Sequence, residues 1–475
     1  MSSSNFPPEV IEKILLNLDG VTLAQSRRVC SLWNQLVTNL IQRKNVWRTC
    51  CLREIPSDVL IELLGNRSYP DECQQWPRIY RQWRQMKKVC SQNPEQNTFS
   101  VSEESPVTCI KITGSYVVTG HRNGDIHLWD RILGRHVVRL GHHYKMVLDM
   151  ALMDLELEGG LVSEINMCEK DVNLYYVQLG VGSAGIGCLC PYHFPDRELD
   201  RQLVISGGKD HTIQVNPIVA NSDWLSEFRP FPMPVVLRHH SDSIECIKTF
   251  NNIVLAGCAD NSISIWILEV SPDTACWPQI SLKQVLIGPP NFLRWIGFWN
   301  NAISCLCYDA RVCRFHINKS TDWLTTSLNF SPNKLYINDR VERIISNCFI
   351  FRDSIIIFLT VDRHFCVSVD GINFRATPTL PSLGSSVVAV NLVGSLLVLG
   401  TETGWTFIYH INSKEDLFKI DLFDFVWSSQ VSEASIIAID VLSSVDGPVV
   451  MVATTDSLTV VQWYQILKKD VIDSA

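Results

Sequence analysis

The first fifty residues repeat apolar positions with the period of an α-helix. Pro7, Pro8 and Glu9 suit a first helical turn, because proline lacks an amide that would stay unbonded there and a carboxylate favours the positive helix end. Asp19-Gly20 ends the pattern. Four aliphatic residues between these signals recur at i, i+3, i+4 and i+7 and share one face: Ile11, Ile14, Leu15 and Leu18.

Two more helices are predicted in the same segment. Thr22 is placed to cap a second helix that carries Leu23 and Val29, and a third apolar stripe runs from Leu32 toward Trp47. A unit of this size cannot bury every apolar side chain, and large exposed apolar patches usually mark an interface. The segment therefore predicts a docking module.

The segment resembles an F-box in the stretches 6–11, 14–18, 28–34 and 46–48, although Phe6 stands where that family usually has Leu. The resemblance implies that this surface is gripped by the Skp-type adaptor of a cullin-RING ubiquitin ligase. The alternative is that the same residues form the core of a small helical domain. The residues to which the resemblance assigns adaptor binding are Pro7, Pro8, Ile11, Ile14, Leu15, Leu18, Leu23, Val29, Cys30 and Trp33.

A further helix is predicted over 76–89. Its apolar residues keep helical spacing from Trp76 to Met86, whereas Arg and Lys take the other positions. Such a basic amphipathic helix can bind a membrane surface or an acidic partner, but a solvated helix that packs its aromatic side against neighbouring domains is the better interpretation. With Pro94 inside a polar run, we expect an F-box at 1–50, a helical linker at 51–97 and a second domain at 98–475.

Beyond residue 106 the helical period disappears, and short β-branched and aromatic runs alternate with turns. Runs at 107–112, 116–119 and 125–129 form one unit, and runs at 243–249, 253–256 and 262–266 repeat it. Weaker copies begin near Met146, Ile186, Asn291, Arg340, Ser385 and Glu433. Units of this period cannot close a core alone, so they predict an all-β propeller of seven or eight blades.

The stretches 120–130 and 256–266 resemble WD repeats, and Gly141-His142 occupies the Gly-His position of that family. Together with the F-box, this places the chain beside the F-box/WD-repeat substrate receptors. The resemblance implies that turns joining the second and third strands of the blades hold the ligand. Basic residues there would suit an acidic or phosphorylated segment of a protein substrate, and Trp405, Trp295 and Tyr308 are the aromatic alternatives. The basic turn residues are Arg122, Lys209, Arg311, Arg363 and His364.

Composition and charge limit the kinds of partner that the chain is expected to bind. The 475 residues show no apolar leader after Met1 and no apolar run long enough to span a bilayer, which indicates a soluble cytoplasmic or nuclear protein without a membrane partner. The first 97 residues carry +4, from thirteen Lys and Arg against nine Asp and Glu, which leaves −12 for the rest of a chain whose total is −8. An acidic main body argues against nucleic-acid binding.

The sequence contains only weak signals of cofactor-binding, metal-binding or catalytic sites. The stretch 180–185 matches G-x-G-x-x-G, but Gly187 and Pro191 break the helix that would meet a dinucleotide. The pairs Cys188/Cys190 and Cys305/Cys307 lack the further ligands of a metal site, and the seventeen cysteines favour reduced, buried thiols. His142-His143 and His239-His240 stand where WD repeats carry a structural His. We predict no catalytic residue, metal or cofactor.

The leading hypothesis is a non-enzymatic adaptor of an SCF-type ubiquitin ligase. Its F-box would dock on the Skp-type adaptor and through it on a cullin and a RING protein, while the propeller binds the protein substrate. A scaffold that binds the adaptor outside a cullin ligase is the main alternative. A propeller enzyme is a third, which would need titratable residues converging on the central channel.

Overall fold

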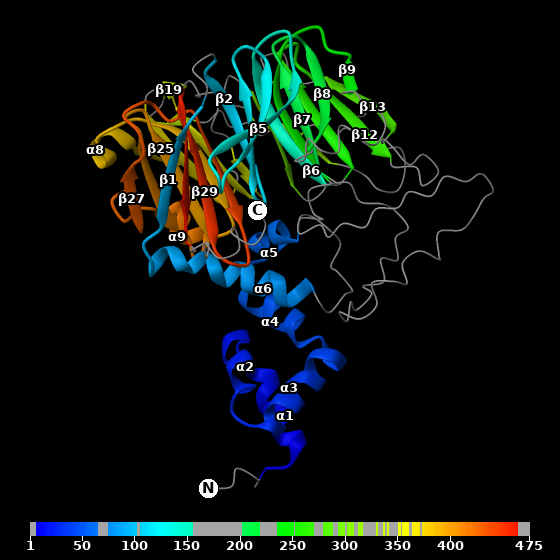
Figure 1. Ribbon diagram of the computed structural model, residues 1–475, viewed down its shortest axis with the longest axis vertical. Helices are drawn as coiled ribbons and strands as arrows, with labels where there is room; N and C mark the ends of the chain where they lie inside the picture. Colours follow the sequence, from blue (N-terminus) through cyan, green and yellow to red (C-terminus); the bar gives the residue numbers. More distant parts are fainter. Residues whose placement is uncertain are drawn as a thin grey trace, which may run out of the picture.

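The structure is a computed structural model in which a helical module lies against one edge of a β-propeller (Figure 1). It describes residues 6–64, 75–101, 105–154, 202–218, 235–250, 252–269, 279–287, 293–299, 302–307, 312–316, 329–330, 336–337, 340–341, 350–352, 354–360, 363–370 and 373–463. Within these ranges, every helix is too short or too polar to cross a membrane.

The three predicted helices of the F-box segment are present, and three more α-helices follow before the propeller. Asn45 adopts a left-handed conformation (φ 44°), so the third stripe ends there and a separate helix begins at Val46. Thr22 is not the cap of the second helix: Asp19 is, and its Oδ1 accepts from the Thr22 amide at 2.8 Å. The helices are α1 (Pro8–Asn17), α2 (Gly20–Ser26), α3 (Ser31–Lys44), α4 (Val46–Glu54), α5 (Ser57–Leu63), α6 (Gln75–Met86) and the 3-10 helix η1 (Lys87–Cys90).

The basic helix packs as its period predicts. All five apolar residues of the α6 stripe are buried, namely Trp76, Ile79, Tyr80, Trp83 and Met86. The first four join one core with buried residues of α1 to α5, so the helical module is a single packed body. Met86 instead packs with residues of two blades. The aromatic residues of α6 therefore belong to the core of the module, and the stripe reaches the propeller at Met86.

The described β-strands form seven four-stranded antiparallel sheets and one two-stranded pair, β18 (Tyr336–Ile337) with β19 (Arg340–Val341). From blade 1 to blade 7, the strands are β2 (Val107–Thr113), β3 (Tyr116–His121), β4 (Asp125–Asp130), β5 (Arg135–His142); β6 (Val147–Asp154), β7 (Gln202–Gly208), β8 (Thr212–Pro217), β9 (Val235–Arg238); β10 (Ile244–Phe250), β11 (Ile253–Cys258), β12 (Ser262–Glu269), β13 (Gln279–Ile287); β14 (Leu293–Trp299), β15 (Ala302–Cys307), β16 (Val312–His316), β17 (Asn329–Phe330); β20 (Ile350–Arg352), β21 (Ile355–Leu359), β22 (His364–Ser368), β23 (Arg375–Pro378); β24 (Val387–Val393), β25 (Leu396–Thr401), β26 (Trp405–His410), β27 (Trp427–Gln430); β28 (Ala438–Ser443), β29 (Pro448–Ala453), β30 (Ser457–Gln462) and, from earlier in the chain, β1 (Glu95–Ser100). Two short helices, α8 (Thr379–Leu383) and α9 (Lys414–Phe418), flank the sixth blade.

Successive blades touch around a closed ring. Their first strands pack in the order β2, β6, β10 and β14 to β20, and β24, β28 and β2, while buried side chains of β21 and β24 join blades 5 and 6. The ring therefore has seven described blades. Seven of the eight predicted repeats correspond to described blades, although the copy predicted near Arg340 begins later, at Ile350, because Arg340 starts the short strand β19. The eighth predicted copy, near Ile186, lies outside the described residues.

The ring closes by pairing two ends of the domain. Strand β1 runs antiparallel to β30, with Glu95 opposite Gln462 and Ser100 opposite Ser457. The first propeller strand thus starts before the boundary at residue 98 that the sequence suggests, because the polar run around Pro94 contains an edge strand. An edge strand supplied from the N-terminal side satisfies the backbone groups that β30 would otherwise expose.

The helical module is bound to the propeller through Arg352, which ends β20 and is 4% exposed. Its Nη2 lies 2.7 Å from Asp58 Oδ2, and its Nη1 lies 2.8 Å from Glu62 Oε2, both on α5. Nη1 also donates to the Gly394 carbonyl of blade 6 at 2.7 Å. We call these four residues the Arg352 lock. A buried cation with two carboxylates and a carbonyl holds α5 and two blades in one geometry.

Replacement of Arg352 should therefore be costly. Arg352→Met keeps much of the side-chain volume but leaves Asp58 and Glu62 without their cation, so we expect the free energy of unfolding to fall by about 3–5 kcal/mol. Urea titration followed by tryptophan fluorescence measures this change. Arg375→Met is the matched control, because Arg375 is exposed and donates to one carbonyl. Equal losses in the two variants would show that the lock does not stabilise the junction.

Candidate functional site

Helices α1–α3 form the end of the helical module farthest from the propeller (Figure 1), and several of their apolar side chains are exposed. Phe6, Val10 and Ile14 are spaced four residues apart along α1 and its entry, so they share one side of the helix. Val29 and Leu32 are exposed where α2 passes into α3, and Val29 is 60% exposed. We call these five residues the α1–α3 apolar set. Their exposure beside a complete core indicates an interface rather than packing.

The ten residues predicted to bind an adaptor divide into three groups by burial. Pro7, Pro8, Ile14 and Val29 are exposed, and Leu18, Cys30 and Trp33 are partly buried. The remaining three lie in the core, so the surface assignment is corrected for them: Ile11, Leu15 and Leu23. The helical stripe alone does not separate these groups, because Ile11 and Leu15 face α3 whereas Ile14 points off the packed side. Val10 and Leu32 are exposed residues that the prediction missed.

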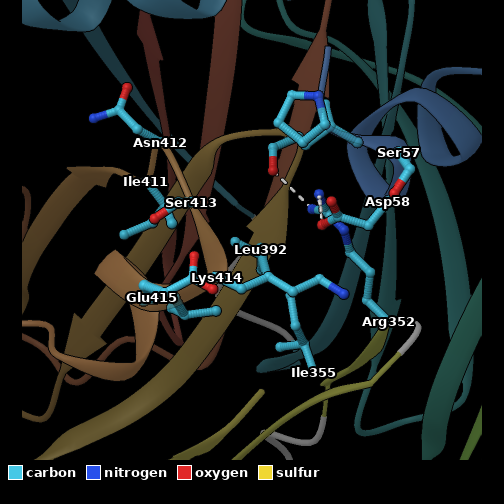
Figure 2. Close-up of a pocket in the computed structure, with 14 residues that line it drawn as sticks. Ser57, Asp58, Arg352, Ile355, Leu392, Ile411, Asn412, Ser413, Lys414 and Glu415 are labelled. Carbon is cyan, nitrogen blue, oxygen red and sulfur yellow. Dashed lines mark hydrogen bonds and ion pairs between the residues drawn. The ribbon is translucent and has the colours of Figure 1, made fainter. Parts of the chain in front are cut away.

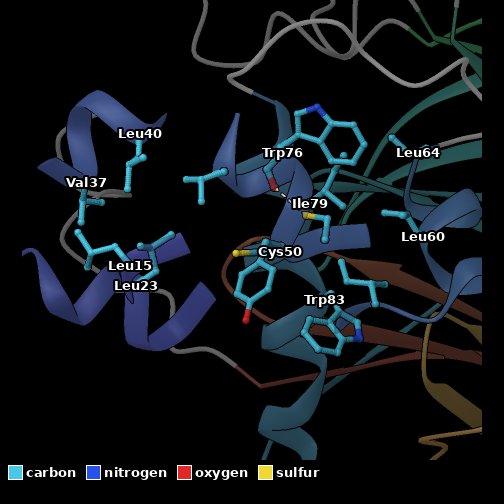
Figure 3. Close-up of a cluster of buried hydrophobic side chains, with 14 of the residues drawn as sticks. Leu15, Leu23, Val37, Leu40, Cys50, Leu60, Leu64, Trp76, Ile79 and Trp83 are labelled. Carbon is cyan, nitrogen blue, oxygen red and sulfur yellow. Dashed lines mark hydrogen bonds between the residues drawn. The ribbon is translucent and has the colours of Figure 1, made fainter. Parts of the chain in front are cut away.

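The buried group explains how the small unit keeps its shape. Figure 3 shows Leu15, Leu23 and Val37 at one end of the core that extends to Trp76 and Trp83. Gly20 begins α2 beneath the ring of Tyr80, where an added Cβ would lie 2.5 Å from Tyr80 Cζ. The Gly20 amide and the Tyr80 hydroxyl both donate to Glu54, at 3.1 and 2.5 Å. These contacts fix α1–α3 on the helices that reach the propeller.

The opposite side of the propeller carries the turns between second and third strands. Arg122 lies in the β3–β4 turn of blade 1 and Lys209 in the β7–β8 turn of blade 2, and both are exposed. The segment that links blade 1 to blade 2 is hydrogen-bonded to both of these turns. The His143 amide donates to the Gly124 carbonyl, and the Lys209 amide donates to the Met146 carbonyl, at 2.8 Å each. The structure therefore places Arg122 and Lys209 on neighbouring parts of one face.

The other predicted turn residues are not brought to this place. Arg363 is exposed in the β21–β22 turn of blade 5 with φ 66°, and His364 begins β22 half-buried. Blade 5 does not adjoin blades 1 and 2 in the ring. Arg311 lies outside the described residues. Of the five predicted basic turn residues, only Arg122 and Lys209 are therefore neighbours on this face. Arg363 and His364 lie together on blade 5, away from that pair.

Exposed residues on the segments that link successive blades lie on the same face as Arg122 and Lys209. Tyr144 is 81% exposed, and its amide donates to Asp210 Oδ2 at 3.0 Å, which places it beside the Lys209 turn. Lys145, His142 and His239 are exposed on the same kind of link. We call Arg122, His142, Tyr144, Lys145, Lys209 and His239 the basic face. The sequence marked two of these positions as members of His pairs but not as exposed.

The second histidine of each pair is structural. The sequence predicts a structural histidine in each pair, but its assignment of the Gly-His position to Gly141-His142 is wrong by one residue, because His142 is exposed and His143 is buried. The imidazole of His143 contacts Asp210 Oδ1 at 3.0 Å and Ser206 Oγ at 2.9 Å. Burial alone would raise the pKa of Asp210, but hydrogen bonds from His143 and Thr212 hold it below its ordinary value. His240 contacts Ser262 Oγ at 3.0 Å and Ser264 Oγ at 2.6 Å. These histidines order the links and leave the first member of each pair to solvent.

His240, Cys258 and Asp260 form a possible metal-ligand group among the described residues. Each has protein partners: both His240 nitrogens contact serines, Cys258 Sγ donates to the Asp242 carbonyl at 3.2 Å, and Asp260 accepts from Ser262. Burial raises the pKa of Cys258 to about 12, so its sulfur stays protonated. These contacts assign the group to blade structure.

Several other candidates lie outside the described residues. They are the glycine-rich stretch 180–185, the pair Cys188/Cys190, Tyr308 and the side chains of Trp295 and Cys307. Cys305 is buried in β15. Trp405, the remaining aromatic alternative, is 38% exposed and stacks on Phe407 with ring centroids 6.1 Å apart.

Comparison with known families agrees with this division of the chain. The F-box domain family matches residues 3–45, and the family of WD domains, G-beta repeat, matches residues 94–130 and 233–266. The chain therefore carries an F-box and WD repeats. The first WD match contains β1–β4, and the second contains β9–β11 and β12 as far as Trp266. The recognisable repeats of this F-box/WD-repeat chain are therefore in blades 1 and 3, together with the closure strand and the last strand of blade 2.

Two curated relatives are similar over about half of this F-box/WD-repeat chain. Cell division control protein 4 of Candida albicans is 24% identical over 306 residues, and WD repeat-containing protein pop2 of Schizosaccharomyces pombe is 22% identical over 308. Each match covers 55% of this chain and 42% of the relative, so the chain aligns with less than half of each. Similar solved structures include the WD40 β-propeller domain of Doa1 (14% identity, TM-score 0.48, 78% of this chain and 97% of that one) and the computationally designed Ika8 protein (15%, 0.41, 76% and 97%).

The buried histidines predict acid sensitivity. Burial lowers the pKa of His240 to about 4, below the ordinary value near 6.5. The unfolded chain therefore binds more protons between about pH 6.5 and about pH 4, so stability should be complete above this window and fall as pH decreases through it. His240→Gln should flatten this dependence, measured as the thermal midpoint against pH. His239→Gln, at the exposed neighbour, should keep the wild-type slope. An unchanged slope in His240→Gln would contradict the assignment.

Proposed function

We propose that this protein is a non-catalytic substrate receptor of an SCF-type ubiquitin ligase that works in the cytoplasm or the nucleus. The F-box would dock on a Skp-type adaptor, and through it on a cullin and a RING protein. The propeller would bind the protein that receives ubiquitin. In this arrangement the chain contributes by positioning its substrate, and the chemistry belongs to its partners.

The α1–α3 apolar set is the observation that carries the proposal. Ile11, Leu15 and Leu23 already fill the core, so the exposed apolar residues are not required for folding of the module. They belong to α1–α3 and the segments beside these helices, which lie at the end of the module away from the propeller (Figure 1). A hydrophobic adaptor surface is the partner that such a set fits, because burial of apolar side chains drives association.

The basic face supports the substrate half of the proposal. It gathers Arg122, Lys145 and Lys209 on a domain whose overall charge is negative. Tyr144 adds an exposed ring, and aromatic residues with arginine are common anchors of protein interfaces. An acidic or phosphorylated segment of a protein substrate has the charge that this face would bind.

Charge placed in the apolar set should remove adaptor binding. Ile14→Asp/Leu32→Asp puts two carboxylates at positions that are 45% and 39% exposed, so the helices should still fold while the buried contact becomes unfavourable. Affinity purification with mass spectrometry should recover the Skp-type adaptor and the cullin with the wild-type chain, and at least tenfold less of both with the variant.

Ile132→Asp/Leu133→Asp is the matched control. These residues have the same identities, are 39% and 48% exposed, and lie on blade 1 rather than on the F-box. The control should retain both partners. Recovery of the adaptor without the cullin from wild type would favour a scaffold outside a cullin ligase, and equal recovery from both variants would contradict the docking surface.

The basic face predicts a charge-reversal effect on the substrate alone. Arg122→Glu/Lys209→Glu should lower the recovery of substrate proteins by about tenfold while adaptor recovery is unchanged, because repulsion replaces attraction at one face. Arg135→Glu/Lys419→Glu makes the same charge change at exposed residues on the other side of their blades. Quantitative proteomics of all three chains compares them. Identical substrate profiles would rule out this face.

A further inference from the structure

Exposed apolar side chains gather on the outer part of blade 6, in the segment between α9 and β27 and at the start of β26. Phe423 is 63% exposed, Phe425 39% and Val426 38%. Trp405 is 38% exposed and is connected to Phe425 through Phe407, which stacks on Trp405 and contacts Phe425 edge-on with ring centroids 5.3 Å apart. We call Trp405, Phe423, Phe425 and Val426 the blade-6 patch. Large apolar side chains gathered on a surface usually mark an interface.

The segment that presents the patch is held in place by the blade. Its Leu422 carbonyl accepts a hydrogen bond from the Tyr409 hydroxyl at 2.8 Å. Asp421 forms a turn, because its Oδ1 accepts from the Phe423 amide at 3.0 Å and its carbonyl accepts from the Asp424 amide at 3.1 Å. A partner would therefore meet a preformed surface and pay little to order it. Three residues of α9 and this segment are buried in the core that blades 5 and 6 share: Leu417, Ile420 and Leu422.

Helix α9, which precedes the segment, lies at the junction with the helical module. Its residues Lys414 and Glu415 line a pocket of about 300 Å³ together with Asp58 of α5 and Arg352 of blade 5 (Figure 2). The Lys414 ammonium also donates to Ser354 Oγ at 3.1 Å. The blade-6 patch therefore follows directly on the part of the propeller that contacts α5, whereas the basic face lies on blades 1 and 2.

The charges beside the patch indicate the kind of partner. Lys419 is the one exposed cation between residues 414 and 426. Arg375 of β23 is also exposed, and it donates to the Phe418 carbonyl at 3.1 Å. A protein segment with lysine or arginine beside its apolar side chains complements this surface, whereas an anionic membrane surface would be repelled by it. The same stretch exposes four carboxylates: Glu415, Asp416, Asp421 and Asp424.

We propose that the blade-6 patch binds a segment of another protein that combines bulky apolar side chains with lysine or arginine. The apolar side chains would cover Phe423, Phe425 and Trp405, and the basic ones would face Asp421 and Asp424. This site has the opposite charge preference from the basic face and lies on a different blade, so one chain can hold two protein segments at once. The inference does not depend on the adaptor or on the basic face.

Three short peptides test the chemistry of the site on the full wild-type chain. Fluorescein-labelled Lys-Leu-Phe-Lys-Leu-Lys should bind with a Kd on the order of 100 μM in anisotropy titrations. Lys-Ser-Ser-Lys-Ser-Lys keeps the charge but lacks the apolar side chains, and Gln-Leu-Phe-Gln-Leu-Gln keeps the apolar side chains but lacks the charge. Both should bind about fivefold more weakly or less, because each removes one of the two features that the patch recognises.

A double variant locates the binding. Phe423→Ser/Val426→Ser removes two exposed side chains and should weaken binding of the lysine-leucine peptide by about tenfold. Ile132→Ser/Leu133→Ser removes two exposed apolar side chains from blade 1 and should bind as wild type does. Equal affinities of the two variants, equal affinities of wild type for the three peptides, or no binding of the lysine-leucine peptide to wild type would each overturn the proposal. The last two results do not require a variant to fold.

Two further measurements separate the other possible occupants of the patch. In sedimentation velocity, wild type and Phe423→Ser/Val426→Ser should have the same oligomeric state. In flotation with phosphatidylcholine vesicles, the two chains should behave alike. Self-association or vesicle binding that the variant abolishes would assign the patch to a second copy of the chain or to lipid, and would overturn the proposal.

Discussion

The junction of the two domains depends on one buried cation. Arg352 ends a short propeller strand, yet its guanidinium is neutralised by two carboxylates of α5 and bonded to a carbonyl of blade 6. A buried charge is tolerated only when its partners are all in place, so this group acts as a geometric requirement more than as a source of stability. If α5 moved away, both the cation and the carboxylates would lose their partners together.

The closure of the ring adds a second attachment close in sequence. Helix η1 leads to β1 after four residues, and β1 completes the seventh blade by pairing with β30. The Trp463 indole donates to the Gln92 carbonyl at 3.1 Å, between these two elements, and Gln82 of α6 donates to Ser443 at 2.6 Å. The helical module is thus joined to blades 5, 6 and 7, and its rotation would disturb the strand pairing that closes the propeller.

The sequence predicts the periodic parts of this architecture well. Strong local signals, such as the turn at Asn123-Gly124 with its positive φ at Gly124, place the strands of blade 1 within one or two residues. The sequence does not predict burial or strand pairing where these depend on long-range contacts. The stripe of α1 does not reveal that Ile11 and Leu15 pack on α3 while Ile14 faces solvent, and β1 looks like a polar linker because its partner lies more than 350 residues away. Arg352 carries no local signal, since only the fold brings α5 to the end of β20.

Long-range contacts also determine the composition of the basic face and its position relative to the helical module. The sequence shows the two histidine pairs, but it does not show which member of each pair is buried. That division depends on long-range hydrogen bonds such as the one between His143 and Ser206. The Arg352 lock uses the strand ends at which first and second strands join, whereas Arg122 and Lys209 lie at the opposite ends, so the basic face and the helical module occupy opposite edges of the propeller. Because the lock and the closure strand fix this arrangement, a partner bound at one surface is held in a defined position relative to the other, which is the physical condition for a receptor that acts by positioning.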